Sequence, residues 1–275
     1  MHISHPAPDV TALTDAVPLP GIGFLPVNAH LLHAEQPVLV DTGLRAASAE
    51  FLDVLWSLVD PADLRWIYLT HPDRDHTGSV FEILEAAPSA RLVTTFLGMG
   101  LLSLERPVPP DRVYLLNPGQ SLDVGDRGLL AFRPPVYDNP ATTAIIDDRT
   151  GTCFSSDCFG APMTSRDLVE SDDVAAIPHA DLIAGQRLWA VLDSPWLCEV
   201  DRNLFHSSLH PLRDADPPVV LSTHLPPAHH RTAAMLDTLA GAPDAPPYIG
   251  PDQEAFLRLL TELEPATGGP APQNG

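Results

Sequence analysis

Residues 71–76 read HPDRDH, so two histidines and two aspartates lie within six positions, directly after an apolar stretch. Imidazole nitrogens and carboxylate oxygens are common ligands of zinc, iron and manganese. Successive side chains alternate along an extended chain, so His71 and Asp73 can converge on one point. Asp75 and His76 lie past a bend and can face a second point nearby. The spacing predicts a metal site; the alternative is a solvated loop in which Asp75 caps the next helix.

Apolar patterning predicts the elements that must position these residues. The stretch 65–70 is expected to be a buried strand that ends at His71, and 78–88 a helix that follows the motif. Further strands are expected over the ranges 24–34, 37–43, 90–95, 121–125, 128–135, 142–148, 151–157 and 217–224. Further helices are expected over 46–59, 180–194, 197–212 and 252–264, and residues 1–20 are expected to be an irregular lead-in. We predict one mixed α/β domain with two sheets over residues 1–264 and a disordered tail over 265–275.

Composition narrows the classes of function. Asp and Glu total 36 against 15 Lys and Arg, which gives a formal charge of −21 and argues against binding to nucleic acids or anionic membrane surfaces. No apolar run reaches the roughly 20 residues of a membrane span, and no secretory signal is visible. The three cysteines, Cys153, Cys158 and Cys198, suit buried thiols in a reducing compartment. We therefore expect a cytoplasmic protein.

Four motifs in a consistent order resemble the metallo-β-lactamase superfamily. THPDRDHTG resembles its H-x-H-x-D-H signature, with Asp73 in place of the middle histidine. PVLVDTG, CFSSDCFG and VVLSTH resemble the early strand that ends in aspartate, the strand that ends in the bridging aspartate, and the last strand that ends in histidine. Together these motifs span residues 25–227. The resemblance implies a four-layer αββα sandwich with two metal ions at one edge.

Two details are similar to the flavodiiron branch of that superfamily. Flavodiiron proteins also carry a carboxylate at the middle position, and the SSDCFG run resembles the strand around their bridging aspartate. The stretch PPVYDNPATT aligns best with their His-Trp-Pro-Asp stretch and puts Asp138 where histidine is expected. Tyr137 is the competing candidate, and an ordinary turn at Asp138 is the alternative reading.

The resemblance implies a ligand set for each metal ion. The first metal ion would be held by His71, Asp73, Asp138 and the bridging Asp157. The second would be held by Asp75, His76, Asp157 and His224. Asp41 would orient a ligand without binding metal, and Asp75 and Tyr137 are the candidate catalytic residues. Carboxylates in place of imidazoles favour iron, with manganese or zinc as alternatives, as the two divalent ions.

Two functions compete on this scaffold. In the first, a diiron-type site binds or reduces a small molecule such as O₂ or NO; because we find no flavodoxin-like segment, an external reductase would supply the electrons. In the second, a zinc hydrolase attacks an ester, amide or phosphoester through a metal-bound hydroxide. A metal-free binding scaffold is a third option if the first site has decayed. The resemblance also makes a homodimer one option for assembly.

Overall fold

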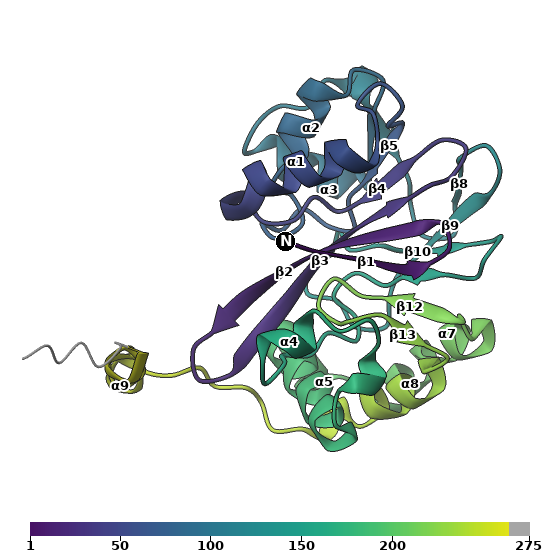
Figure 1. The fold of residues 1–275 in the computed structure, drawn as a ribbon. Coiled ribbons are helices and arrows are strands. Elements are labelled where there is room, and N and C mark those ends of the chain that lie inside the picture. Colours follow the sequence, from purple (N-terminus) through teal and green to yellow (C-terminus); the bar gives the residue numbers. More distant parts are fainter. Residues whose placement is uncertain (264–275) are drawn as a thin grey trace, which may run out of the picture.

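Two β-sheets lie face to face between two layers of helices (Figure 1). The computed structural model describes residues 1–263. Helices α1, α2 and α3 cover the outer face of the first sheet, and α5 to α8 cover the outer face of the second (Figure 1). This arrangement confirms the predicted αββα sandwich.

The first sheet contains seven strands in chain order, β1-β2-β3-β4-β5-β6-β7. The first four strands pair antiparallel, whereas β4 to β7 pair parallel. The strands are β1 (His2–Ala7), β2 (Val10–Leu19), β3 (Gly23–Leu32), β4 (Val38–Val40), β5 (Trp66–Tyr68), β6 (Arg91–Thr94) and β7 (Val113–Leu115).

The second sheet contains six strands in the order β13-β12-β11-β10-β9-β8. Only the β11–β12 pair is parallel, so these two strands end at the same edge of the sheet. The strands are β8 (Ser121–Asp123), β9 (Gly128–Phe132), β10 (Ala144–Asp147), β11 (Cys153–Phe154), β12 (Val219–Leu221) and β13 (Ala228–His229).

Nine α-helices and five short 3₁₀ helices complete the described part of the chain. The α-helices are α1 (Ser48–Leu58), α2 (Val80–Ala86), α3 (Phe96–Ser103), α4 (Arg166–Val169), α5 (His179–Asp193), α6 (Arg202–Ser208), α7 (His210–Ala215), α8 (Thr232–Ala240) and α9 (Gln253–Leu263). The 3₁₀ helices are Arg45–Ala47, Pro110–Arg112, Val174–Ala176, Pro195–Glu199 and Ala242–Asp244.

Alternation of side chains along the strands explains the layers. On β4, Leu39 packs among the residues of α1 and α2, whereas Val38 and Val40 face the second sheet. Phe154 of β11 joins the same cluster between the sheets, and its neighbour Cys153 packs beneath the helices of the other side. Strands with apolar residues on both faces are those expected at the centre of a sandwich.

The irregular lead-in expected over residues 1–20 is wrong, because this segment forms β1 and β2. Val10, Ala12 and Leu13 are buried, and the β-branched residues Val10, Thr11 and Thr14 are the strand signal. The prolines concealed it. Pro18 is tolerated because β1 pairs with β2 only as far as Thr14, so β2 has a neighbour on one side only at Pro18.

The single helix expected over 197–212 is also wrong. The structure has a 3₁₀ turn followed by α6 and α7, which meet at Leu209. Pro211 does not end a helix; it lies in the first turn of α7, where its missing N–H costs nothing.

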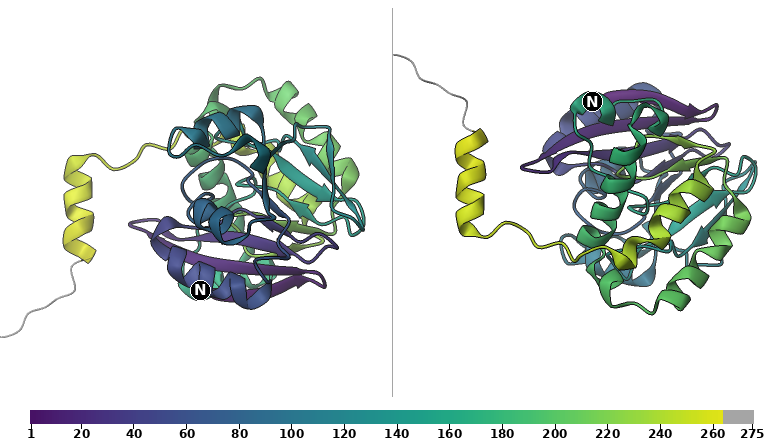
Figure 2. Two further views of the ribbon diagram at one scale, coloured as in Figure 1. Left: turned by 90° about the horizontal axis from the view of Figure 1, so that it is seen from above. Right: turned by 90° about the horizontal axis from the view of Figure 1, so that it is seen from below.

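The C-terminal helix α9 lies apart from the four layers (Figure 2). An extended segment connects it to the body, and Leu259 reaches Gly21 at the tip of the β2–β3 hairpin. The tail predicted over 265–275 lies outside the described residues.

Candidate dinuclear metal centre

The ends of two parallel strand pairs deliver the candidate ligands. Strands β4 and β5 run parallel in the first sheet, and they lead to Asp41 and to the loop from His71 to His76. Strands β11 and β12 run parallel in the second sheet, and they lead to Asp157 and His224. Because the carboxyl ends of parallel neighbours lie at one edge, both sheets contribute side chains to a single region.

Asp157 lies between two groups of side chains. Its Oδ2 atom is 3.3 Å from Nε2 of His71. Its Oδ1 atom is 3.1 Å from Nε2 of His76 and 3.3 Å from Nε2 of His224. The two carboxylate oxygens therefore face different histidines, as a bridging ligand requires.

The first cluster consists of His71, Asp73, Asp138 and Asp157. Nε2 of His71 lies 3.8 Å from Oδ2 of Asp73 and 3.7 Å from Oδ1 of Asp138. A ring nitrogen of His71, a carboxylate oxygen of Asp73 and one of Asp138 lie within 4.8 Å of one another. The structure therefore brings together the residues predicted for the first metal ion.

The second cluster consists of Asp75, His76, His224 and Asp157. Oδ2 of Asp75 lies 3.3 Å from Nε2 of His224 and 3.6 Å from Nε2 of His76. These distances bring together the residues predicted for the second metal ion.

Hydrogen bonds to the far side of two histidine rings orient them. Oδ2 of Asp41 lies 2.8 Å from Nδ1 of His76, and Asp41 also accepts bonds from the backbone N–H and hydroxyl of Thr70. Nδ1 of His224 donates to the carbonyl of Pro26 at 2.8 Å. With Nδ1 engaged, Nε2 of each ring points into the cluster, which is the usual role of partners behind a metal-binding histidine.

Several buried polar atoms at the two clusters have no hydrogen-bond partner among the described residues. They are Nε2 of His71, Nε2 of His76, Oδ1 of Asp138 and Oδ1 of Asp157. Buried polar atoms without partners are rare in folded proteins and call for an explanation, such as a bound ion. Imidazole and carboxylate donors converging on two points fit two cations.

The histidines and carboxylates of the two clusters interact strongly with one another. Burial disfavours the charged forms, yet the histidines around Asp157 hold the pKa of its carboxyl well below the usual range. Against the same burial, Asp157 and its neighbouring carboxylates raise the pKa of His76 well above its ordinary value and that of His224 to about 10. Because histidine and carboxylate ligands bind a cation in their deprotonated forms, metal binding should release protons.

A third group of carboxylates adjoins the first cluster. Asp138, Asp157 and Asp193 each place an oxygen within 4.8 Å of the others. Burial, and then the neighbouring carboxylates, raise the pKa of Asp193 to about 8; burial is also the largest cause that raises the pKa of Asp138 to about 6. Two carboxylates this close repel each other by roughly 3 kcal/mol at an effective dielectric constant of about 20.

Tyr137 does not join either cluster. Its ring packs 5.3 Å from the ring of Trp196 and lies beneath the guanidinium of Arg133. Its backbone carbonyl accepts a bond from Trp196. The adjacent Asp138 is the residue that reaches the first cluster, so the catalytic role of Tyr137 stays a prediction.

Three contacts at the site were not anticipated from the sequence. Asn139 donates from Nδ2 to Oδ1 of Asp73 at 2.9 Å and so fixes that carboxylate. The indole N–H of Trp189 donates to the carbonyl of Asp157, and its ring packs 4.7 Å from the ring of His224. Asp193, on the same helix as Trp189, lies near the first cluster. The helical segment 180–194 carries no local signal of these contacts.

The loops at the site contain strained backbone. Asp41, Ser156 and Phe159 have φ values of 60°, 56° and 73°, in the left-handed region that non-glycine residues rarely adopt. Two of these three residues flank Asp157, and the third orients His76. Such strain persists only where surrounding contacts enforce it, and it concentrates at functional sites.

Gly78 closes the histidine loop against the loop after β4. A Cβ added at this position would lie 2.3 Å from the backbone of Gly43, Leu44 and Arg45. The N–H of Gly78 also donates to the carbonyl of Gly43 at 2.8 Å. Only glycine allows the two loops to approach this closely, which brings Asp41 against His76.

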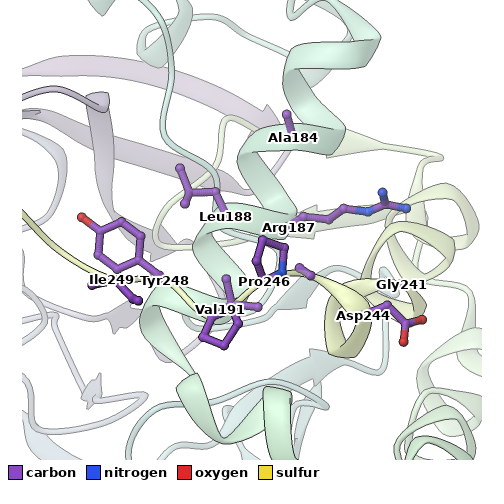
Figure 3. Close-up of a pocket in the computed structure, with 11 residues that line it drawn as sticks. Ala184, Arg187, Leu188, Val191, Gly241, Asp244, Pro246, Tyr248 and Ile249 are labelled. Carbon is purple, nitrogen blue, oxygen red and sulfur yellow. The ribbon is translucent and has the colours of Figure 1, made fainter.

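A cavity of about 600 Å³ lies elsewhere, along the outer side of α5 (Figure 3). Leu188 and Val191 of α5 and Pro246 and Tyr248 of the segment before α9 contribute to its walls. None of the residues that line it belongs to either cluster.

Comparison with known proteins agrees with this architecture. The family model described as "Metallo-beta-lactamase superfamily" matches residues 22–184, more than half of the chain. The chain belongs to the metallo-β-lactamase superfamily. The match contains the whole histidine loop, Asp138 and Asp157, and it confirms the family predicted from the four motifs.

Curated relatives of this superfamily member carry flavoprotein names. A putative diflavin flavoprotein A 1 from Thermosynechococcus vestitus is 29% identical over 174 residues, which cover 61% of this chain and 30% of that protein. An anaerobic nitric oxide reductase flavorubredoxin from Salmonella typhi is 28% identical over 134 residues, which cover 48% of this chain and 28% of that protein. The chain thus spans less than a third of the length of these two relatives.

Solved structures with the same fold are flavodiiron proteins. Rubredoxin oxygen:oxidoreductase from Desulfovibrio gigas aligns with a TM-score of 0.76 at 16% identity, covering 90% of this chain and 62% of that one. The flavodiiron protein from Giardia intestinalis aligns with a TM-score of 0.74 at 14% identity, covering 88% and 59%. At these identities the likeness establishes the fold. Among residues 1–263, no helix combines the length and apolar composition that a membrane span needs.

Proposed function

We propose that this chain holds two iron ions in the first and second clusters and binds or reduces a small molecule such as O₂ or NO. Electrons would come from an external donor. The names of its relatives, a nitric oxide reductase and a rubredoxin oxygen:oxidoreductase, support this class of reaction. The homodimer implied by the resemblance and the cytoplasmic location expected from composition stay predictions.

The orientation of Asp157 carries the proposal. One of its oxygens faces His71 and the other faces His76 and His224, so one carboxylate can serve both clusters. A cation in each cluster would satisfy the buried ligand atoms that have no hydrogen-bond partner.

The donor chemistry favours iron or manganese over zinc. The two clusters contain four different aspartates against three histidines, and carboxylate-rich sets suit harder cations than all-imidazole sets do. When bound, a pair of iron ions would pass electrons from the external donor to a small diatomic molecule and would offer the open coordination positions that its reduction needs.

Residues behind the ligands would hold them in position around this centre. Asp41 and the Pro26 carbonyl hold the rings of His76 and His224 from behind. Asn139 holds Asp73 in the same way. Asp75 lies at the second cluster with 31% of its side chain exposed, where solvent can reach it, and it is our candidate for a catalytic residue.

A metal and turnover measurement tests the proposal. Protein purified without chelator or added metal should contain about two irons per chain. The chemically reduced protein should consume O₂ or NO in a sealed electrode cell. Asp157→Ala is the control, because it should lose both metals and the activity. Iron-free protein that stays inactive after reconstitution with iron would contradict the proposal.

A zinc hydrolase is the second candidate, favoured by the second cluster. Besides the shared Asp157, it contains His76, His224 and Asp75, and two histidines with carboxylates form a set that zinc accepts. About two zincs per chain, with activity on a panel of esters and phosphoesters, would favour this function over the first.

A further inference from the structure

We propose that Asp193 is an additional ligand of the metal ion in the first cluster. The proposal rests on the metal centre proposed above and adds to it a residue from a different element. Asp193 is the last residue of α5, far along the chain from the histidine loop.

The geometry brings Asp193 to the ligands already described. One carboxylate oxygen from each of Asp138, Asp157 and Asp193 can be chosen so that all lie within 4.8 Å of one another. Asp138 and Asp157 are also members of the first cluster, so the two groups share two of their residues. The three carboxylates come from the β9–β10 loop, the end of β11 and the end of α5, and they meet only in the folded chain.

A second observation points to a cation at this place. His71 is 1% exposed, and its Nε2 atom has no hydrogen-bond partner among the described residues. Nε2 points at Oδ1 of Asp138, 3.7 Å away, and that oxygen is also buried without a partner. Two unpaired ligand atoms of different chemistry thus face each other in the first cluster, which shares Asp138 and Asp157 with the carboxylate group that contains Asp193.

The described surroundings of Asp193 hold no arginine that pairs with its carboxylate. Its hydrogen bond is donated by the hydroxyl of Ser194 at 3.2 Å. The C-terminus of a helix carries partial negative charge, which disfavours a carboxylate in the last turn of α5. Within residues 1–263, no arginine lies within 4.0 Å of Asp193, Asp138 or Asp157. A bound cation would supply the missing positive charge.

A ligand set of four aspartates and one histidine would change which ion the first cluster prefers. Oxygen-rich sets suit manganese and iron, whereas zinc binds well to sets richer in nitrogen or sulfur. The second cluster has two histidines, so the two positions should differ in selectivity.

The test compares metal binding by the wild-type chain with that of Asp193→Asn and Asp193→Ala. Asp181→Asn is the matched control, because Asp181 lies exposed on the same helix. Each purified protein is loaded anaerobically with Fe²⁺ or Mn²⁺, bound metal is counted per chain, and affinity is measured by chelator competition. Circular dichroism establishes that each variant is folded.

The expected result is two metals in the wild type and the control. Both Asp193 variants should lose one metal, or bind one of the two at least about tenfold more weakly, by analogy with losses measured at other metal sites. In crystals of the loaded wild type, an Asp193 oxygen should lie about 2.0–2.2 Å from the metal, the usual carboxylate distance.

Two other results would overturn the proposal in distinguishable ways. If the wild type binds two metals and both Asp193 variants bind them with unchanged affinity, Asp193 is not a ligand and instead holds a proton within the carboxylate group. If the wild type itself binds no metal, the proposed function fails and this inference fails with it.

Discussion

Oδ2 of Asp41 lies 2.8 Å from Nδ1 of His76, and both side chains are almost fully buried. Asp41 follows β4 and His76 ends the loop after β5, so this contact joins the two loops that follow neighbouring parallel strands. The carboxylate fixes the direction of the imidazole, and it is itself fixed by Thr70.

Asp41→Asn should weaken metal binding without abolishing it. In the wild type, a carboxylate oxygen of Asp41 accepts from Nδ1 of His76. The amide at position 41 would replace one carboxylate oxygen with an N–H group, so the imidazole of His76 would lose its preferred orientation. Changes of this kind behind a ligand typically cost 10- to 100-fold in metal affinity, approximately what we expect for the second cluster. Chelator competition measures the loss, with the exposed Asp63→Asn as control; equal affinity in both variants would contradict the role of Asp41.

Asp157→Ala should remove both metal ions, because its two oxygens face both clusters. Elemental analysis of the folded variant provides the measurement. Retention of two metals per chain would refute the dinuclear arrangement, and retention of one would show that Asp157 serves a single cluster.

Asp138→Ala and Tyr137→Phe separate two neighbouring candidates. Asp138 contacts the first cluster, whereas the Tyr137 ring packs on Trp196, so only the aspartate variant should empty the first cluster. Metal counting on both proteins checks this expectation. The opposite pattern would mean that the tyrosine is the ligand.

Gly78→Ala should destabilise the fold. The added Cβ would lie 2.3 Å from backbone atoms of the loop after β4, and overpacking of this kind costs about 1–3 kcal/mol in free energy of unfolding. Gly100→Ala, in α3 with open space around the added methyl, should instead stabilise the chain by up to about 1 kcal/mol. Denaturant titration of both variants gives the comparison; equal effects would disprove the close approach of the two loops.

His30 should contribute a loss of stability in mild acid. Burial in the sandwich lowers the pKa of His30 to about 4, from an ordinary value near 6.5. Below pH 6.5 the unfolded chain takes up the proton and the folded chain does not, so the contribution of His30 to the free energy of unfolding drops by about 3 kcal/mol as pH falls toward 4. The raised pKa values of Asp193 and Asp138 act in the opposite direction over this range, because the folded chain holds those protons and the unfolded chain does not. The contribution of His30 is therefore measured as the difference between the wild type and His30→Leu in denaturation of the metal-free proteins at each pH.

His30→Leu should lose this contribution, so its free energy of unfolding should rise relative to that of the wild type as pH falls from 6.5 toward 4, whereas the exposed His210→Gln should run parallel to the wild type. A parallel pH profile for wild type and His30→Leu would assign the effect to another group.

The sequence predicts the fold and brings most residues of the candidate metal centre together, because both depend on short-range patterns. His71, Asp73, Asp75 and His76 belong to one loop, and Asp157 and His224 each end an apolar strand, so position along the chain reports position at the sheet edge. The lead-in could not be predicted in this way, since its prolines obscured the β-branched residues of β2.

Asp193 could not be found from local sequence for a different reason. A helix that ends in Asp-Ser-Pro is ordinary capping and turn chemistry, and nothing nearby in the chain indicates a charge partner. Its relation to Asp138 and Asp157 arises only when α5 packs on the second sheet, so it depends on long-range contacts that no periodicity reports.

The ligands of each cluster come from both sheets, with the histidine loop on one side and Asp157 and His224 on the other. Bound ions would therefore link the two sheets of the sandwich, and separating the sheets would require the ions to dissociate. At free metal a thousandfold above the dissociation constant, one such ion would add about 4 kcal/mol to stability. The melting temperature of the protein would then report how fully its metal sites are loaded.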